Sequence, residues 1–198
     1  MQFKIINQFH PLRVKAENFI IEKYRKNFSA NIKKFPNILL ALINREEEIV
    51  ACCGIRTEKD GLFSQVYLKE NIRKIIQRIK SSKENFKIFE IVNLTTSNPI
   101  ASIKFVKELH RYMFDHQVKY VIFSGTMILR NFLLMMGLKL TVLAKAEINN
   151  ISNPEDWGRY YDSDPHVCLA ETPAVQFSIL FKKFKEQLEY VNISSIAQ

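Results

Sequence analysis

An acid in an apolar segment and the polar loop that follows it are the residues of this chain best suited to chemistry. Glu90 lies among apolar neighbours in residues 87–94, and the loop 95–98 leads to Pro99, which suits the first turn of a helix. Burial raises the pKa of a carboxylic acid toward the range useful to a general base. A helix start presents free backbone N–H groups to an anion. The segment therefore predicts a base beside a site for a phosphate or carboxylate group.

A strand, a polar loop and a helix start in this order resemble the junction midway in the GNAT-like acyltransferase fold, and this resemblance implies acyl transfer from a thioester to an amine. The reaction needs a base for the amine proton, donors for the oxyanion and a site for the acyl donor. Glu90 is the candidate base, with a structural acid paired with Arg56 or Arg130 as the alternative. Asn93 is expected to orient donor or acceptor, or to form a local turn. The donor is expected to bind backbone or side-chain groups of Val92, Leu94, Thr95, Thr96 and Ser97, of which the last three also suit helix capping.

Other segments supply candidate residues for binding the substrate. Phe63 and Tyr67 are predicted to line an acyl tunnel, or else to belong to the core. Arg130 and Asn131 are predicted to contact a substrate carboxylate, or else to be solvated. An aromatic block around Trp157 is expected to contact a ligand from a loop, or to be a structural anchor. The remaining candidates are Arg56, Ser124, Thr126 and Tyr160.

The spacing of apolar residues predicts the elements that must position these side chains. Apolar positions spaced like one helix face predict helices, and short apolar runs bounded by charged or turn residues predict strands. The predicted helices span residues 12–28, 70–81, 99–116, 127–135 and 173–191, and the predicted extended segments span 38–44, 49–56, 61–68, 87–94, 120–124 and 138–146. Residues 150–170 are expected to form a loop. This order predicts an α/β fold with a mixed central sheet flanked by helices.

Composition and charge limit the class of protein. The 198 residues predict a globular domain, and the absence of a long apolar run or a secretory signal predicts a cytoplasmic protein. The 29 Lys and Arg residues against 20 Asp and Glu give a net charge of +9, which favours an acidic partner. Nucleic acid is the least favoured of these, because no recognition motif is present. The three cysteines and four histidines have no metal-ligand spacing, so no metal site is predicted.

Particular residues of the chain resemble those of the thermostable hemolysin family. The likeness covers roughly residues 10–170, and its most specific part is the block Trp157-Gly-Arg-Tyr160-Tyr161-Asp162. The element order is similar to that of GNAT-like acyltransferases, and more faintly to acyl-homoserine-lactone synthases. The other residues that carry the resemblance are Arg13, Glu17, Tyr24, Ala30, Phe35-Pro36, Gly54-Ile-Arg56, Leu62-Phe63, Tyr67-Leu68, Glu90-Ile-Val-Asn93-Leu94, Phe123, Gly137-Leu138 and Pro165.

The resemblance implies a place for the acyl donor. In that fold the pantetheine of the donor lies against the strand that corresponds to residues 87–94, and its pyrophosphate lies at the start of the helix 99–116. The loop 95–101 departs from the Gly-rich turn of acetyl-CoA-using members, and only Ala101, a further candidate for donor binding, agrees with it. Residues other than glycine keep the backbone farther from an anion. The implied donor is therefore a long-chain acyl-CoA or an acyl carrier protein, with no permanently bound cofactor.

Two functions follow from the sequence and this resemblance. The first is a GNAT-like N-acyltransferase acting on a small amine or amino acid. The alternative is a hemolysin that acts directly on membranes through basic amphipathic segments, without catalysis. Residues 171–198, with an apolar stripe beside lysines, are predicted to form an amphipathic helix and tail apart from the domain 1–170. This helix is expected to pack on the domain, on a second copy of the chain or on a membrane surface.

Overall fold

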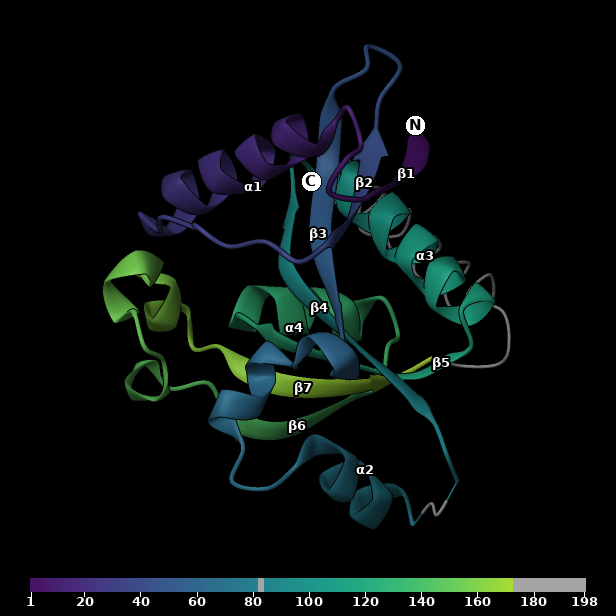
Figure 1. The fold of residues 1–198 in the computed structure, drawn as a ribbon, viewed down its shortest axis with the longest axis vertical. Helices are drawn as coiled ribbons and strands as arrows, with labels where there is room; N and C mark the ends of the chain where they lie inside the picture. The colour runs from purple at the N-terminus through teal and green to yellow at the C-terminus, as the bar shows by residue number, and fades with distance from the viewer. Residues whose placement is uncertain (82–83, 173–198) are drawn as a thin grey trace, which may run out of the picture.

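A seven-stranded mixed sheet forms the centre of the protein in a computed structural model that describes residues 1–81 and 84–172 (Figure 1). In chain order the strands are β1 (Gln2–Ile6), β2 (Ile38–Ile43), β3 (Ile49–Thr57), β4 (Lys87–Thr96), β5 (Val118–Gly125), β6 (Leu140–Lys145) and β7 (His166–Glu171). They lie side by side in the order β1-β2-β3-β4-β5-β7-β6. Only β4 and β5 are parallel among these neighbouring pairs. The prediction of a mixed sheet is confirmed.

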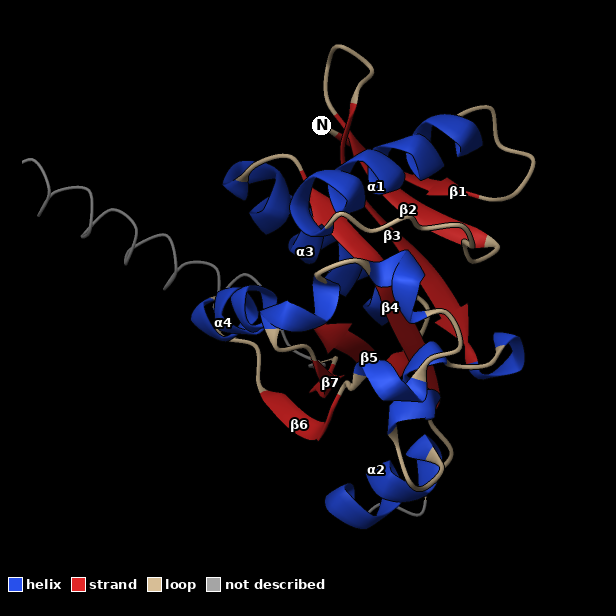
Figure 2. Ribbon diagram, turned by 90° about the vertical axis from the view of Figure 1, so that its left-hand side faces the viewer, coloured by secondary structure: helices blue, strands red, loops and turns tan. Residues whose placement is uncertain are grey.

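Helices cover both faces of this sheet (Figures 1 and 2). Neighbouring side chains of a strand point to opposite faces, and the cysteine pair of β3 marks the two layers. Cys52 packs with Ala16 and Ile20 on one face, whereas Cys53 packs with Phe105 on the other. The elements of the first face are α1 (Arg13–Phe28) and α2 (Ile72–Lys80), and those of the second are α3 (Pro99–Asp115) and α4 (Met127–Met135).

The helices of the second half begin at side chains that satisfy free N–H groups. The Asn98 side chain accepts a hydrogen bond from the Ala101 N–H at 2.9 Å, one residue before the predicted start of α3 at Pro99. The Thr126 hydroxyl accepts from the Leu129 N–H at 3.3 Å and begins α4. These contacts confirm both predicted helices and their starting points.

One prediction for the C-terminal part of the chain is wrong. Residues 150–170 were expected to form a loop, but His166–Glu171 forms β7, which lies between β5 and β6 and pairs with both. Its apolar run, Val167–Ala170, has only four residues and is buried in a central strand. Asp164-Pro165 precedes the strand. The sequence also gave no prediction for β1. The predicted helix at 173–191 lies outside the described residues.

The segment 61–68 is a second difference from the prediction. It was expected to be extended, but Phe63–Tyr67 forms a 3₁₀ turn, η2. Its backbone N–H groups point to a side chain of β4 and not to a neighbouring strand. The other 3₁₀ turns of the described residues are η1 (Glu58–Asp60), η3 (Ile148–Asn150), η4 (Pro154–Trp157) and η5 (Tyr160–Ser163).

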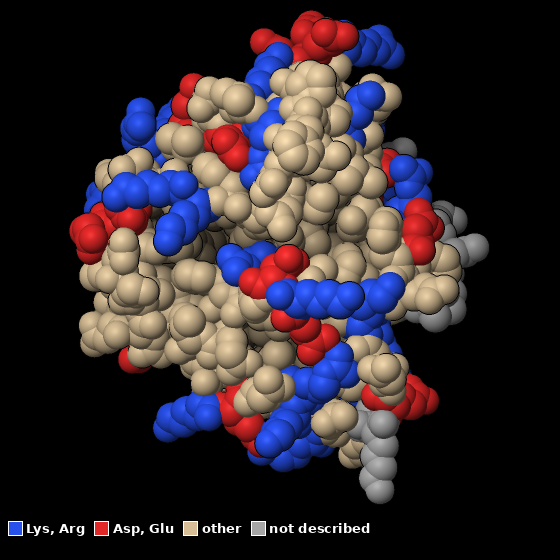
Figure 3. Space-filling model, viewed as in Figure 1, with Lys and Arg blue, Asp and Glu red and all other residues tan. Residues whose placement is uncertain are grey.

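The basic face of α2 is largely paired with acids of the protein itself. Arg73 pairs with Glu58, Arg78 pairs with Glu70 at 2.8 Å, and Lys80 pairs with a carboxylate of β7. Basic and acidic side chains also alternate over the face drawn in Figure 3. Within residues 1–81 and 84–172, no helix is long and apolar enough to cross a membrane, and no cluster of acids, histidines and cysteines could hold a metal ion.

Candidate functional site

The parallel strands β4 and β5 separate halfway along β4 (Figure 1). Residues Lys87–Glu90 pair with β5, and the last pair joins Glu90 to Ile122. From Ile91 onward β4 remains paired with β3 alone among the described strands. One edge of β4 therefore faces an opening where its backbone groups are available to a ligand.

A bulge in β4 accompanies this separation. Gly54 of β3 pairs with Val92. Cys52, two residues earlier in β3, pairs with Thr95, so β4 carries one extra residue between these pairs. Asn93 lies there with a φ of 55°, a conformation that Asn adopts more readily than most residues. Asn93 therefore lies in a bulge inside β4 and not in the local turn at a strand end that was predicted as its structural role.

A cavity of about 540 Å³ fills the opening and extends to both sides of the sheet. This volume is in the range of small-molecule sites. On the side of α1, the part that we call the aromatic chamber is lined by Phe63, Tyr67, Glu90, Ser124, Trp157 and Tyr160. On the side of α3 and α4, the part that we call the apolar arm is lined by Phe105, Val106, Leu109, Val121, Phe123 and Leu133. Val92, Asn93 and Leu94 line the cavity between them. The surface below α1 is hollowed, with Lys and Arg side chains beside the hollow (Figure 3).

Glu90 is fully buried where the aromatic chamber meets the strand opening. The Phe63 N–H donates to its Oε2 at 2.5 Å, and the Ser64 N–H donates to its Oε1 at 2.7 Å. The Ser64 hydroxyl donates to the same Oε1 at 2.5 Å and lies 3.1 Å from the Ser124 hydroxyl. Three donors from one turn therefore hold the carboxyl group of Glu90 in place.

Burial raises the pKa of Glu90, and this effect outweighs the opposing effects of its hydrogen bonds and of the Arg56 charge. A buried carboxyl group with a raised pKa and access to a cavity is suited to proton transfer. Ion pairing with Arg56 or Arg130, the alternative from the sequence, is not found among the described contacts. Glu90 has neutral hydrogen-bond partners instead.

Aromatic rings form the walls around this carboxyl group. The Phe63 ring stacks on Trp157 with centroids 5.5 Å apart, and Tyr67 meets Phe63 edge-on at 5.9 Å. Trp157 also contacts Tyr160 at 5.3 Å. The Tyr67 and Tyr161 hydroxyl oxygens are 2.5 Å apart. Phe63 and Tyr67 thus line the cavity in the aromatic chamber.

The loop that carries Trp157 is fixed against the end of α1. Gly158 has a φ of 50°, and a Cβ there would lie 2.3 Å from the Phe28 carbonyl oxygen. That oxygen accepts a hydrogen bond from the Arg159 N–H at 2.7 Å. The Tyr160 hydroxyl donates to the Ser124 carbonyl of β5 at 2.9 Å. The aromatic block is therefore both an anchor and part of the cavity wall.

The segment 29–37, which we call the strap, passes over β3 beside the cavity. Arg13 of α1 holds its end, donating to the Pro36 carbonyl at 2.7 Å and to the Asn37 carbonyl at 3.0 Å. Glu17 orients the Arg13 guanidinium at 2.7 Å. Pro36 sits on Gly54, where a Cβ would lie 2.5 Å from the proline Cγ. Only glycine allows so close an approach of the strap to β3.

The junction between β4 and α3 contains both cavity residues and capping residues. Thr95 and Thr96 line the cavity. Ser97 and Ala101 do not line it: Ser97 is exposed, whereas Ala101 is fully buried and its N–H is bound by Asn98. The positions of Ser97 and Ala101 therefore do not support their predicted role in donor binding, because Ser97 lies outside the cavity wall and the Ala101 N–H is used by the helix cap.

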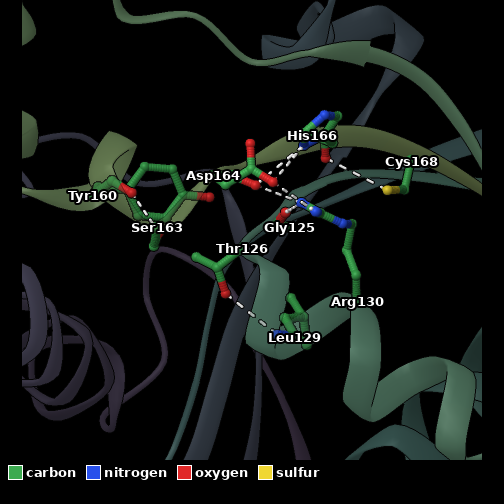
Figure 4. Close-up of polar contacts among 9 residues, drawn as sticks. All are labelled: Gly125, Thr126, Leu129, Arg130, Tyr160, Ser163, Asp164, His166 and Cys168. Atoms are coloured by element: carbon green, nitrogen blue, oxygen red, sulfur yellow. Dashed lines mark hydrogen bonds and ion pairs between the residues drawn. The ribbon is translucent and has the colours of Figure 1, made fainter.

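Arg130 lies outside the cavity wall and is held by polar contacts with Gly125 and Asp164 (Figure 4). Its guanidinium donates to the Gly125 carbonyl at 3.0 Å and to both the carbonyl and the carboxylate of Asp164. Asn131 is exposed and lies outside the cavity wall. The predicted contact of Arg130 and Asn131 with a substrate carboxylate is not supported, because Asp164 already neutralises the arginine. Thr126 caps α4 and lines the cavity.

Ser64 is the main site residue that the sequence reasoning missed. It is fully buried and joins Glu90 to Ser124 through its hydroxyl group. A serine shortly after Gly61 is a turn signal that could have indicated this role. The alternation of apolar residues in the same segment favoured an extended conformation.

Comparison with known proteins relates this architecture to a family and to solved structures. The family model described as thermostable hemolysin matches residues 6–175. No curated protein matches the sequence. Several of the residues noted as typical of that family, among them Arg13, Pro36 and Gly54, hold the strap.

Solved structures share the fold at low sequence identity. FeeM, an N-acyl amino acid synthase from uncultured soil microbes, aligns with a TM-score of 0.59 and 14% identity, over 88% of this chain and 97% of that chain. LasI, an AHL synthase, gives a TM-score of 0.57 and 9% identity over 87% and 91%. An N-acetyltransferase from Staphylococcus aureus Mu50 gives 0.50 and 8% over 87% and 99%. The predicted GNAT-like fold is confirmed.

Proposed function

This chain belongs to the thermostable hemolysin family, and we propose that it is an acyltransferase that moves an acyl group from a thioester to the amine of a small molecule. The observation that carries the proposal is the cavity that crosses the sheet at the opening between β4 and β5, with buried Glu90 beside it. Structures with this fold include proteins named as AHL synthase, N-acyl amino acid synthase and N-acetyltransferase, which supports acyl transfer as the reaction class.

The acyl donor would occupy the strand opening and the apolar arm. A pantetheine arm carries amide groups that can pair with the free edge of β4 around Val92–Leu94. The thioester would then lie at the opening, with the acyl chain among Phe105, Leu109 and Leu133. Chain contacts of this kind favour a long acyl group, because each buried methylene contributes about 0.8 kcal/mol.

The donor would be a long-chain acyl-CoA or an acyl carrier protein. The end of β4, next to the loop that leads to α3, offers the hydroxyl side chains of Thr95 and Thr96 at the cavity wall. Among the first residues of α3, Pro99 has no N–H group and the Ala101 N–H is already bound by Asn98. A loop that uses side chains in this way suits a single phosphate at least as well as a pyrophosphate.

The reaction would take place beside Glu90. The amine nitrogen attacks the thioester carbonyl carbon, a C–N bond forms and the C–S bond breaks. Glu90 takes the proton of the amine and returns it to the leaving thiolate, which gives an amide and a free thiol. Backbone N–H groups of β4 near Asn93 would stabilise the oxyanion during this step.

A transfer assay tests the proposal directly. The purified protein is mixed with a pool of small amines and with acetyl-CoA, a long-chain acyl-CoA or an acylated carrier protein. Free thiol and acylated products are measured by mass spectrometry. We expect amine-dependent thiol release with a long-chain donor and an unchanged rate in Asn131→Ala, which lies outside the cavity. Absence of any acylated product with all three donors would overturn the proposal.

Direct action on membranes is the second candidate, and one surface feature favours it. Helix α4 exposes Ile128, Leu134 and Met135, with Ile128 77% exposed. Exposed apolar side chains on one helix can insert into a membrane interface. Leakage of dye from anionic liposomes without any thioester, lost in Ile128→Lys but kept in Ile100→Lys on α3, would support this function. Liposomes that stay intact would count against direct action on membranes and leave acyl transfer as the proposed function.

A further inference from the structure

We propose that Arg56 binds a carboxylate of the acceptor, so that the acceptor class is amines with a carboxylate close to the amino group, such as α-amino acids. This inference rests on the proposed function, because it names the acceptor of the same site. It replaces the predicted role of Arg130, which Asp164 already occupies.

Arg56 and Glu90 are direct neighbours across two strands. They form a register pair of the antiparallel β3–β4 ladder. Side chains of such a pair lie on the same face, with Cβ atoms about 5 Å apart. Both side chains line the cavity, and the Arg56 charge acts on the Glu90 carboxyl group. A positive and an acidic group therefore stand side by side at the aromatic chamber.

The Arg56 guanidinium is held in place by neutral groups. Its Nε donates to the Gly61 carbonyl at 2.7 Å and its Nη2 donates to the Asp60 carbonyl at 3.0 Å. The Asp60 carboxylate is bound by Thr57 instead. Within residues 1–81 and 84–172, Arg56 has no carboxylate partner and its Nη1 has no hydrogen bond. The group is thus oriented without a direct ion pair, although its charge acts on the nearby carboxyl groups of Asp60 and Glu90.

Two other cations near the cavity, unlike Arg56, form ion pairs with acids of the protein. Lys33 pairs with Asp156 at 2.6 Å, and Arg130 pairs with Asp164 at 3.0 Å. A half-buried arginine that is fixed by carbonyl groups, and not by an acid, keeps its charge for an anion from outside. Because Arg56 lies beside the candidate base Glu90, that anion would be a group of the acceptor.

The neighbouring positions of the two side chains suit this acceptor class. In an α-amino acid one carbon separates the amine from the carboxylate. A carboxylate on Arg56 would bring the amine toward Glu90, in reach of the proton transfer. The ring faces of Phe63 and Trp157 line the same chamber and favour an ammonium group before it loses its proton.

The test compares each acceptor with its uncharged analogue. Rates with an α-amino acid and with its carboxamide are measured in the wild type, Arg56→Gln, Arg56→Lys and Lys34→Gln, using one long-chain acyl thioester. Lys34 is the matched control, because it is a cation of the cavity rim on the exposed strap. We expect the wild type to prefer the carboxylate by about 10-fold or more, the effect of one hydrogen bond to a charged group.

Arg56→Gln should lose this preference through a higher KM for the amino acid, while its rate with the carboxamide stays near that of the wild type. Arg56→Lys should keep part of the preference and Lys34→Gln all of it. An equal loss of rate with both acceptors would mean that Arg56 only stabilises the turn at Asp60 and Gly61, and it would overturn the inference. If Arg56→Gln does not fold, the ratio of the amino-acid rate to the carboxamide rate in Arg56→Lys is compared with that of the wild type, and this comparison decides between the two roles of Arg56. Wild-type transfer to both acceptors at equal rates refutes this inference alone, whereas transfer to neither refutes the proposed function.

Discussion

The two ends of the cavity differ in chemistry, although one gap in one sheet joins them. The apolar arm is lined mainly by α3, α4 and β5, whose backbone groups bond within the helices or, for β5, with the neighbouring strands β4 and β7. The aromatic chamber is lined by 3₁₀ turns and loops, and there the N–H groups of Phe63 and Ser64 bind Glu90. The paired backbone of the arm thus leaves only side chains for a ligand there, whereas turns and the free edge of β4 also offer backbone groups.

This difference separates the two substrates of the proposed reaction. An apolar arm with no buried charge suits an acyl chain. A chamber with an acid, an arginine and aromatic rings suits a small charged amine. The two would meet at the bulge around Asn93, where β4 leaves β5.

Glu90→Gln should have the largest effect, because it removes the proton acceptor from the aromatic chamber. We expect the transfer rate to fall about 100-fold or more. Binding of the acyl donor, measured by titration calorimetry, should stay within a few-fold of the wild type. Ser64→Ala is the matched variant: it keeps the carboxylate but removes one donor, so its rate should fall less. A Glu90→Gln rate equal to that of the wild type would make Glu90 a structural acid.

Filling the apolar arm should change the choice of donor with little change in the chamber. Val106 of α3 lines the arm, and Val106→Phe would occupy the place of two or more methylene groups. We expect roughly 10–200-fold loss of kcat/KM for long acyl chains for each methylene excluded, and little loss for short ones. Ile100→Phe, on the exposed side of α3, is the control. Equal losses for all chain lengths would place the acyl group elsewhere.

Arg130→Met should affect stability and not the acceptor. The variant leaves the Gly125 carbonyl without its donor, which costs about 1–2 kcal/mol in the free energy of unfolding. The KM for the acceptor should be unchanged, in contrast to Arg56→Gln. Arg111→Met at the surface should change neither quantity. A raised KM in Arg130→Met would return the acceptor carboxylate to Arg130.

The pH dependence of stability should show the smallest effect. Because burial raises the pKa of Glu90 in the folded protein, the folded state binds more protons than the unfolded state between the ordinary pKa, about 4.3, and the raised one. The Glu90 contribution to stability is therefore fully present below the ordinary pKa and is lost as the pH rises through the raised value. Urea titrations should show this fall in the wild type but not in Glu90→Gln. An opposite slope would mean a lowered pKa.

Local signals in the sequence predicted the part of the site that strand β4 and helix α3 form. Asn98 and Pro99 mark the start of α3, and an acid within an apolar strand marks Glu90. The chamber depends on contacts between distant residues, which no local pattern records. Ser64 binds an acid 26 residues away, and the Arg130 partner is 34 residues away. For the same reason the sequence did not predict β7 between β5 and β6, or that the turn η2 replaces a strand.

The most direct test of this account is photolabelling of the protein with a long-chain acyl thioester that carries a diazirine at the end of its acyl chain. If the chain passes through the sheet, mass spectrometry should locate the label on Leu109, Met113 or Leu133, which line the cavity on α3 and α4. Excess unlabelled donor should prevent the labelling. Label on η2 or the loop around Trp157, or label that competitor does not reduce, would contradict the assignment of donor and acceptor to opposite sides of the sheet.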